Sequence, residues 1–226
     1  MSFGGARIRG GRALGLCVAG VCAAGISTGA AASGPLHASA SCTVPHTHVV
    51  ASSRRAVIRA QRRHHPGAWY YGCAFASGRA HKLFQETTGS MVTSEFVERA
   101  AVNNVFGALS VRHLDIAGGC RSQVKVFNLR TGRRLRQAFG LDPADPPSAS
   151  TRPCPSVARL VVTGTGGAAW TTTSTTNWRS VEVRKDDTHG QATLARSTAI
   201  NPKSLRLHGH TLSWVDAGVR HHVRIG

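Results

Sequence analysis

Acidic residues are scarce in this chain of 226 residues, which has 10 Asp and Glu against 28 Lys and Arg. Asp142 and Asp145 lie among prolines, without the partner carboxylate that glycoside hydrolysis needs. Asp186, Asp187 and Asp216 occupy expected turn positions, where such side chains cap backbone amides. The acids therefore suggest no catalytic pair.

Two short nucleophile or phosphate motifs are also incomplete. Ser174 has no Gly-x-Ser-x-Gly context. The glycine-rich segment 163–167 is followed neither by a helix nor by Lys-Ser/Thr, so it is expected to be a turn between strands and not a phosphate loop. The sequence assigns no catalytic residue and no cofactor, and a non-enzymatic role is favoured.

Long apolar runs are lacking apart from one near the N-terminus. Arg7, Arg9 and Arg12 precede the uncharged segment 13–24, which is the layout of a secretory signal peptide. Cleavage before Ser33 and cleavage before Ser41 both fit the small-x-small rule. A transmembrane anchor is the alternative, although the Gly and Ala content makes this segment weakly hydrophobic. We expect a secreted, extracellular protein with a signal peptide at 1–32.

No Cys-x-x-Cys spacing occurs, which argues against a zinc site. Outside the signal, four cysteines remain, and an even number in an exported chain predicts disulfides. Three pairings are possible. The preferred one joins neighbours along the chain, Cys42 with Cys73 and Cys120 with Cys154.

Aromatic residues are not interleaved with the cations, so a nucleic-acid stacking surface is not expected. The formal net charge of +18 instead favours an anionic envelope polymer or a protein partner. The cations are densest in the first part of the mature chain, and the polyanion-binding residues proposed from the sequence are Arg54, Arg55, Arg59, Arg62 and Arg63. Their spacing predicts a partly helical or poorly ordered linker at 33–66.

From residue 67 onward the patterns are those of strands. Short alternating segments separated by turns, with no long helical run, predict an all-β domain at 67–226. Four strands are expected in 96–139, four in 157–195 and three in 204–225, while 69–76 and 80–86 resemble the third and fourth strands of another unit. This predicts a propeller-like array of about three four-stranded antiparallel sheets, with possible closure by the N- and C-terminal strands.

The repeated unit carries tryptophan in its second strand, at Trp170 and Trp214, with Phe106 at the comparable place. We expect these side chains to form repeated cores between sheets. Segments 126–132, 161–170 and 204–220 resemble blades of secreted actinobacterial propeller-like proteins, which are similar to TolB and WD40-like propellers. The resemblance implies a fold but no established activity, so it supplies no functional residues.

Histidines are the remaining candidates for chemistry. His208 and His210 would share a face if their strand continued through Gly209, and His221 and His222 lie on the next arm, so a metal site is conceivable, although surface histidines are commoner. We therefore expect a secreted, non-enzymatic propeller-like module that binds a protein or an anionic envelope polymer. A hydrolase or lyase on the same scaffold is the alternative.

Overall fold

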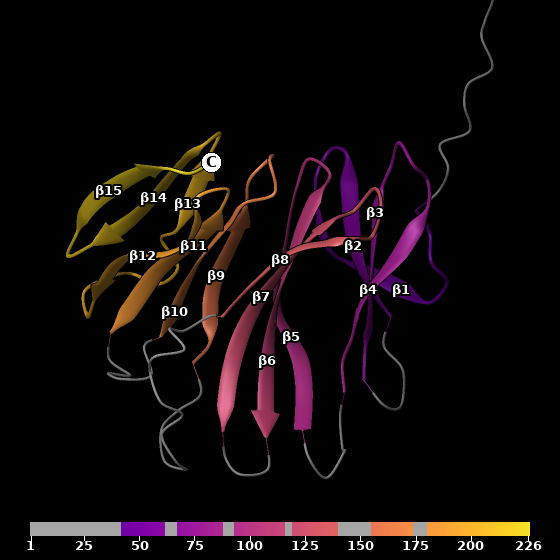
Figure 1. Ribbon diagram of the computed structural model, residues 1–226, viewed down its shortest axis with the longest axis horizontal. Helices are drawn as coiled ribbons and strands as arrows, with labels where there is room; N and C mark the ends of the chain where they lie inside the picture. Colours follow the sequence, from indigo (N-terminus) through magenta and orange to yellow (C-terminus); the bar gives the residue numbers. More distant parts are fainter. Residues whose placement is uncertain (1–41, 62–66, 88–92, 116–118, 140–154, 174–179) are drawn as a thin grey trace, which may run out of the picture. The chain divides into compact units, whose positions relative to one another are not determined.

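Antiparallel strands build the fold in a computed structural model, which describes residues 42–61, 67–87, 93–115, 119–139, 155–173 and 180–226. No helix occurs within these ranges, and the all-β prediction is confirmed. The strands form four sheets in which neighbours along the chain pair with each other (Figure 1). In none of the described segments is there a helix long and apolar enough to cross a membrane.

Sheet 1 contains β1 (Thr47–Ser52), β2 (Ala56–Gln61), β3 (Trp69–Ala74) and β4 (Ala80–Gln85). Sheet 2 contains β5 (Thr93–Asn103), β6 (Phe106–Asp115), β7 (Cys120–Asn128) and β8 (Arg134–Phe139). Sheet 3 contains β9 (Val157–Val162), β10 (Ala168–Thr173), β11 (Val181–Asp187) and β12 (Gly190–Ser197). Sheet 4 has three strands, β13 (Arg206–His208), β14 (Thr211–Asp216) and β15 (Val219–Arg224).

The expected linker at 33–66 is wrong for its described part. Residues 47–52 and 56–61 are β1 and β2, so the folded part begins before residue 67, and these strands belong to a further sheet, the fourth among the described residues. In β2, Ala56, Ile58 and Ala60 point into a core, and this alternation with a period of two is what a strand requires. The proposed signal peptide at 1–32 lies outside the described residues.

Each pair of successive sheets encloses its own apolar core. Ile58 of sheet 1 packs with Leu109 and Phe127 of sheet 2. The second core joins sheets 2 and 3 around Trp170, and the third joins sheets 3 and 4 around Trp214. Both tryptophans are buried, at 0% and 6% exposure, so their predicted role as repeated core residues is confirmed. Phe106 is half-buried and packs against the second core.

Carboxylates link sheets 1 and 2 and sheets 2 and 3. Glu86, which follows β4, accepts hydrogen bonds from Tyr70 Oη at 3.0 Å and from the backbone N–H of Val97 in sheet 2 at 2.9 Å. Glu98 of β5 pairs with Arg112 and accepts the backbone N–H of Val157 in sheet 3 at 3.2 Å. These acids satisfy backbone donors that the ladders leave free.

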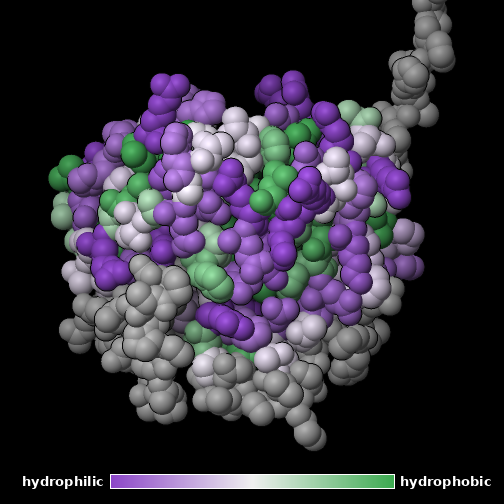
Figure 2. All heavy atoms as spheres, viewed as in Figure 1, coloured by the Kyte–Doolittle hydropathy of each residue, from purple (hydrophilic) through white to green (hydrophobic). Residues whose placement is uncertain are grey.

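A third carboxylate links sheets 3 and 4. The Asp187 carboxylate accepts hydrogen bonds from Lys185 Nζ at 2.7 Å and from the backbone N–H groups of His189 at 2.9 Å and Gly226 at 3.1 Å. The bond to His189 confirms the predicted turn-capping role of Asp187. All acidic side chains whose burial the structure describes are buried or half-buried, namely Glu86, Glu95, Glu98, Glu182, Asp186, Asp187 and Asp216. The cationic side chains therefore dominate the exterior, and Figure 2 shows hydrophilic residues spread over the visible face with small hydrophobic groups between them.

Candidate anion-binding site

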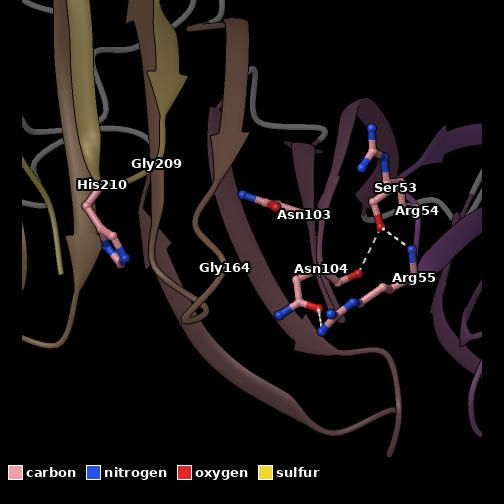
Figure 3. Close-up of a pocket in the computed structure, with 8 residues that line it drawn as sticks. All are labelled: Ser53, Arg54, Arg55, Asn103, Asn104, Gly164, Gly209 and His210. Atoms are coloured by element: carbon pink, nitrogen blue, oxygen red, sulfur yellow. Dashed lines mark hydrogen bonds between the residues drawn. The ribbon is translucent and has the colours of Figure 1, made fainter. Parts of the chain in front are cut away.

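A cavity of about 610 Å³ is lined by the first hairpin turn of every sheet. Sheet 1 contributes its β1–β2 turn, sheet 2 its β5–β6 turn, sheet 3 its β9–β10 turn and sheet 4 its β13–β14 turn. We call this space the first-turn cavity; its lining residues are Ser53, Arg54, Arg55, Asn103, Asn104, Gly164, Gly209 and His210 (Figure 3).

The β1–β2 turn supplies the two arginines of the cavity. The Ser53 hydroxyl accepts the backbone N–H groups of Arg55 at 3.2 Å and Ala56 at 3.1 Å, which closes the turn in the manner of an N-terminal serine cap. Arg54 and Arg55 at the tip are both exposed. Figure 3 shows their side chains extending in different directions, with Arg55 directed toward Asn104.

Hydrogen bonds join the cavity wall across three sheets. Ser53 Oγ donates to the Asn104 backbone carbonyl at 2.9 Å, and Arg55 Nη1 donates to Asn104 Oδ1 at 3.4 Å (Figure 3). Asn103 Nδ2 donates to the Val162 carbonyl of sheet 3 at 3.0 Å. Asn104 has a positive φ of 55°, a conformation that asparagine tolerates better than most residues. The β1–β2 and β5–β6 turns are thus bonded to each other, and Asn103 bonds sheet 2 to sheet 3 beside the cavity.

The remaining turns bring small or polar groups. Segment 163–167 is the β9–β10 turn, closed by the bond from Thr163 N to Gly167 O at 2.7 Å, so its predicted role as a turn is confirmed. Gly209 has a φ of 57° and interrupts the strand, which places His210 in the turn and not on a face shared with His208. His210 Nδ1 lies 3.3 Å from the Ile225 carbonyl.

The electrostatics of the first-turn cavity favour anions. No acidic side chain lines it, and neither arginine has an ion-pair partner among the described residues. Guanidinium groups match phosphate and carboxylate oxygens with paired donors, and the Asn103 and Asn104 amides could add neutral donors beside them. The lining of the site therefore favours a negatively charged group, and none of its side chains is a carboxylate.

Of the five arginines proposed from the sequence, two lie at this cavity. Arg59 on β2 is half-buried and donates from Nε to Thr47 Oγ1 at 2.7 Å and from Nη2 to the Thr47 carbonyl at 3.2 Å, which ties β1 to β2. Arg62 and Arg63 lie outside the described residues. The polyanion role thus stays a prediction, and Arg54 and Arg55 are the residues that the geometry brings together with other polar groups.

Asn103 and Asn104 could not be selected from the sequence, and Gly164 and His210 stood out there only as a turn residue and a metal-ligand candidate, because the turns that carry them are far apart in the chain. A usable signal exists in hindsight, since each turn follows the first strand of a repeated unit. The histidine hypothesis gains no support: within the described ranges, no group of three or more His, Cys, Asp or Glu side chains is close enough to hold a metal ion.

The Cys42–Cys73 disulfide is formed, with the Cα atoms 5.7 Å apart, as predicted. It pins the segment before β1 to β3 and covers Val57. Cys120 is disulfide-bonded as well, whereas Cys154 lies outside the described residues, so its pairing with Cys120 remains a prediction.

Comparisons with known proteins supply no family for this chain. No protein-family model matches the sequence, and no curated protein matches it significantly. The functional conclusion therefore depends on the geometry and charge of the chain itself.

Proposed function

We propose that the protein is a secreted, non-enzymatic binding module whose sheets are arranged like the blades of a propeller, and that it binds an anionic envelope polymer at the first-turn cavity. The observation that carries the proposal is the convergence of the same turn from all four sheets on one acid-free cavity with two exposed arginines. In propellers the first strands of the blades surround a central channel.

The order of the cores supports the propeller-like arrangement. Sheet 1 packs on sheet 2, sheet 2 on sheet 3 and sheet 3 on sheet 4, each through one apolar cluster. Blades of a propeller pack face to face in this succession. The disulfide supports secretion, because such bonds persist in oxidising compartments.

The binding proposal is tested by retention on a heparin column. The protein with Arg54→Ser and Arg55→Ser is compared with a matched variant, Arg130→Ser with Arg133→Ser, which removes the same charge from an exposed turn of sheet 2. We expect the cavity variant to elute at clearly lower salt than both the unchanged protein and the matched variant, because Arg54 and Arg55 line an acid-free cavity with asparagine side chains beside them. Equal elution of the two variants would overturn the proposal.

A further inference from the structure

Sheet 4 has one apolar face and one cationic face. Directly opposed residues of an antiparallel pair lie on the same side of a sheet. Leu207, Leu212 and Val223 are in register, and these side chains, with Trp214, pack against sheet 3. Strand alternation then places the intervening residues on the other side.

On that other side, the pairing aligns basic side chains from β13 and β15. Arg206 is in register with Ser213 and His222, and His208 with Thr211 and Arg224. Val215 is in register with Arg220 at the far end. We call this surface the cationic face of sheet 4; its charged or titratable members are Arg206, His208, Arg220, His222 and Arg224.

The five side chains are exposed, so no other part of the described chain covers them. Arg206 Nη1 is held by the carbonyls of Lys203 and Leu205, at 2.7 and 3.0 Å. Arg220 and Arg224 have no ion-pair partner among the described residues. The one acid of this sheet, Asp216, is in register with Val219 on the opposite side and accepts from Ser197 Oγ at 2.8 Å.

We propose that the cationic face of sheet 4 binds a single extended chain of a phosphate-bearing envelope polymer. The dimensions follow from strand geometry: three strands give a face about 10 Å wide, and alternate residues along β15 stand about 7 Å apart. Such a face offers basic side chains at a regular spacing to a narrow polymer with repeating anionic groups. A double helix is wider than this face.

Nucleic acid is the less suitable single-chain ligand. Proteins that bind single-stranded nucleic acid combine cations with aromatic rings on which bases stack. On sheet 4 the aromatic Trp214 lies on the opposite, apolar side, stacked with His221 at 5.5 Å between ring centroids. The cationic face itself carries small or aliphatic residues between its charges, namely Thr211, Ser213 and Val215.

The face ends beside the first-turn cavity, because His208 directly precedes the Gly209–His210 turn that lines the cavity. The inference deepens the proposed function by naming a polymer class and a second contact surface. It is nevertheless testable apart from the cavity, since the arginines concerned are on β15 and those of the cavity are on the β1–β2 turn.

The test uses synthetic poly(glycerol phosphate) as the probe and calorimetry at several salt concentrations. Arg220→Ser with Arg224→Ser is compared with the cavity pair, Arg54→Ser with Arg55→Ser, and with the control pair, Arg130→Ser with Arg133→Ser. We expect the β15 pair to weaken binding about tenfold or more and to reduce the slope of log K against log salt by roughly 1.4, the value for two lost phosphate contacts at about 0.7 each.

A lysine version of the β15 pair, Arg220→Lys with Arg224→Lys, keeps the charge and should retain the salt slope. Circular dichroism checks that each variant is folded. An equal loss in the control pair would overturn the inference, as would tighter binding of single-stranded oligothymidylate than of poly(glycerol phosphate). If only the cavity pair loses affinity, the proposed binding at the cationic face of sheet 4 is wrong, and binding at the first-turn cavity is supported. If only the β15 pair loses affinity, binding at the face is supported and binding at the cavity is wrong.

Discussion

Asp187 shows at the scale of one residue how a buried charge supports this fold. Its side chain is fully buried, yet three donors from two sheets reach it. Burial alone would raise the pKa of Asp187, but the hydrogen bonds from Lys185, Gly226 and His189 outweigh it and lower the pKa to about 2. Burial raises the pKa of the neighbouring Asp186, against the opposing effect of Arg136.

These opposite shifts give opposite contributions to the pH dependence of stability. The contribution of Asp187 is fully present above its unfolded pKa of about 3.9 and is lost as the pH falls through about 2. The contribution of Asp186 is present below its unfolded pKa and is lost as the pH rises through the higher folded value. A variant that changes Asp187 alone therefore isolates its contribution to the pH dependence of stability from that of Asp186.

For Asp187→Asn we expect the free energy of unfolding near neutral pH to fall by about 2 kcal/mol, because Lys185 and the backbone N–H groups of His189 and Gly226 lose their charged acceptor. The difference from the unchanged protein should shrink toward about pH 2, where Asp187 itself becomes protonated. Urea unfolding at a series of pH values measures this. A difference that stays constant over the whole range would mean that Asp187 acts through shape alone.

At the scale of elements, sheets 1 and 2 approach closely at two glycines. A Cβ added to Gly72 of β3 would lie 2.6 Å from Leu129 Cδ2, and one added to Gly107 of β6 would lie 3.0 Å from the same atom and 2.8 Å from Ile58 Cδ1. Leu129 is completely buried, so it has little room to move. The absence of a side chain at these positions allows the first core to close.

Gly72→Ala and Gly107→Ala should each lower the free energy of unfolding by about 1 to 2 kcal/mol through overpacking. The double variant should lose less unfolding free energy than the sum of the two single losses, because both added methyl groups contact the same leucine, Leu129. Thermal or urea unfolding measures these effects. Gly164→Ala is the matched control, since an added Cβ there meets nothing within 4 Å; an equal loss in this control would refute the packing argument.

The sequence predicted most elements closely, and the exceptions have a physical cause. Four strands were expected in 157–195 and are β9 to β12, and the segments at 69–76 and 80–86 are indeed the third and fourth strands of their sheet. β2 was missed because Arg55, Arg59 and Arg62 repeat at helical spacing, while its inward face is mostly alanine. The alternating inward residues of β2 are too weakly hydrophobic to indicate a strand, so the helical spacing of the arginines decided the prediction.

The candidate site was less accessible from sequence than the strands. Its two arginines could be selected by charge, but Arg59 could not be separated from them until its bonds to Thr47 were seen. The asparagines join them only because the first turns of successive sheets meet in space. Turn residues carry no periodic pattern, so sequence alone does not show which turns converge.

At the scale of the whole molecule, the Cys42–Cys73 bond closes a loop with a sequence separation of 31 around the first two strands. The segment before β1 is also attached by the bond from Gln61 Nε2 to the Pro45 carbonyl at 3.1 Å. A cross-link of this length restricts the unfolded chain substantially in the usual entropy model.

Replacing both Cys42 and Cys73 by serine should lower the free energy of unfolding by about 3 to 4 kcal/mol, the value for a loop of this size. Urea unfolding of the oxidised proteins gives the difference, and the double variant avoids the reduction of Cys120 that a thiol reagent would also cause. A loss below about 1 kcal/mol would show that sheet 1 is held by its core and not by the cross-link.

The inward placement of the acids has a consequence for engineering the molecule. Since the described carboxylates serve the interior and the contacts between sheets, the exposed arginines other than Arg196, which pairs with the buried Glu182 at 2.8 Å, can be exchanged without breaking an ion pair among the described residues. Glutamates introduced at enough exposed arginine positions, 130 and 133 among them, would change the sign of the exterior while leaving the scaffold intact. One backbone could then be prepared in cationic and anionic forms, and recognition that depends on shape could be separated from simple attraction between opposite charges.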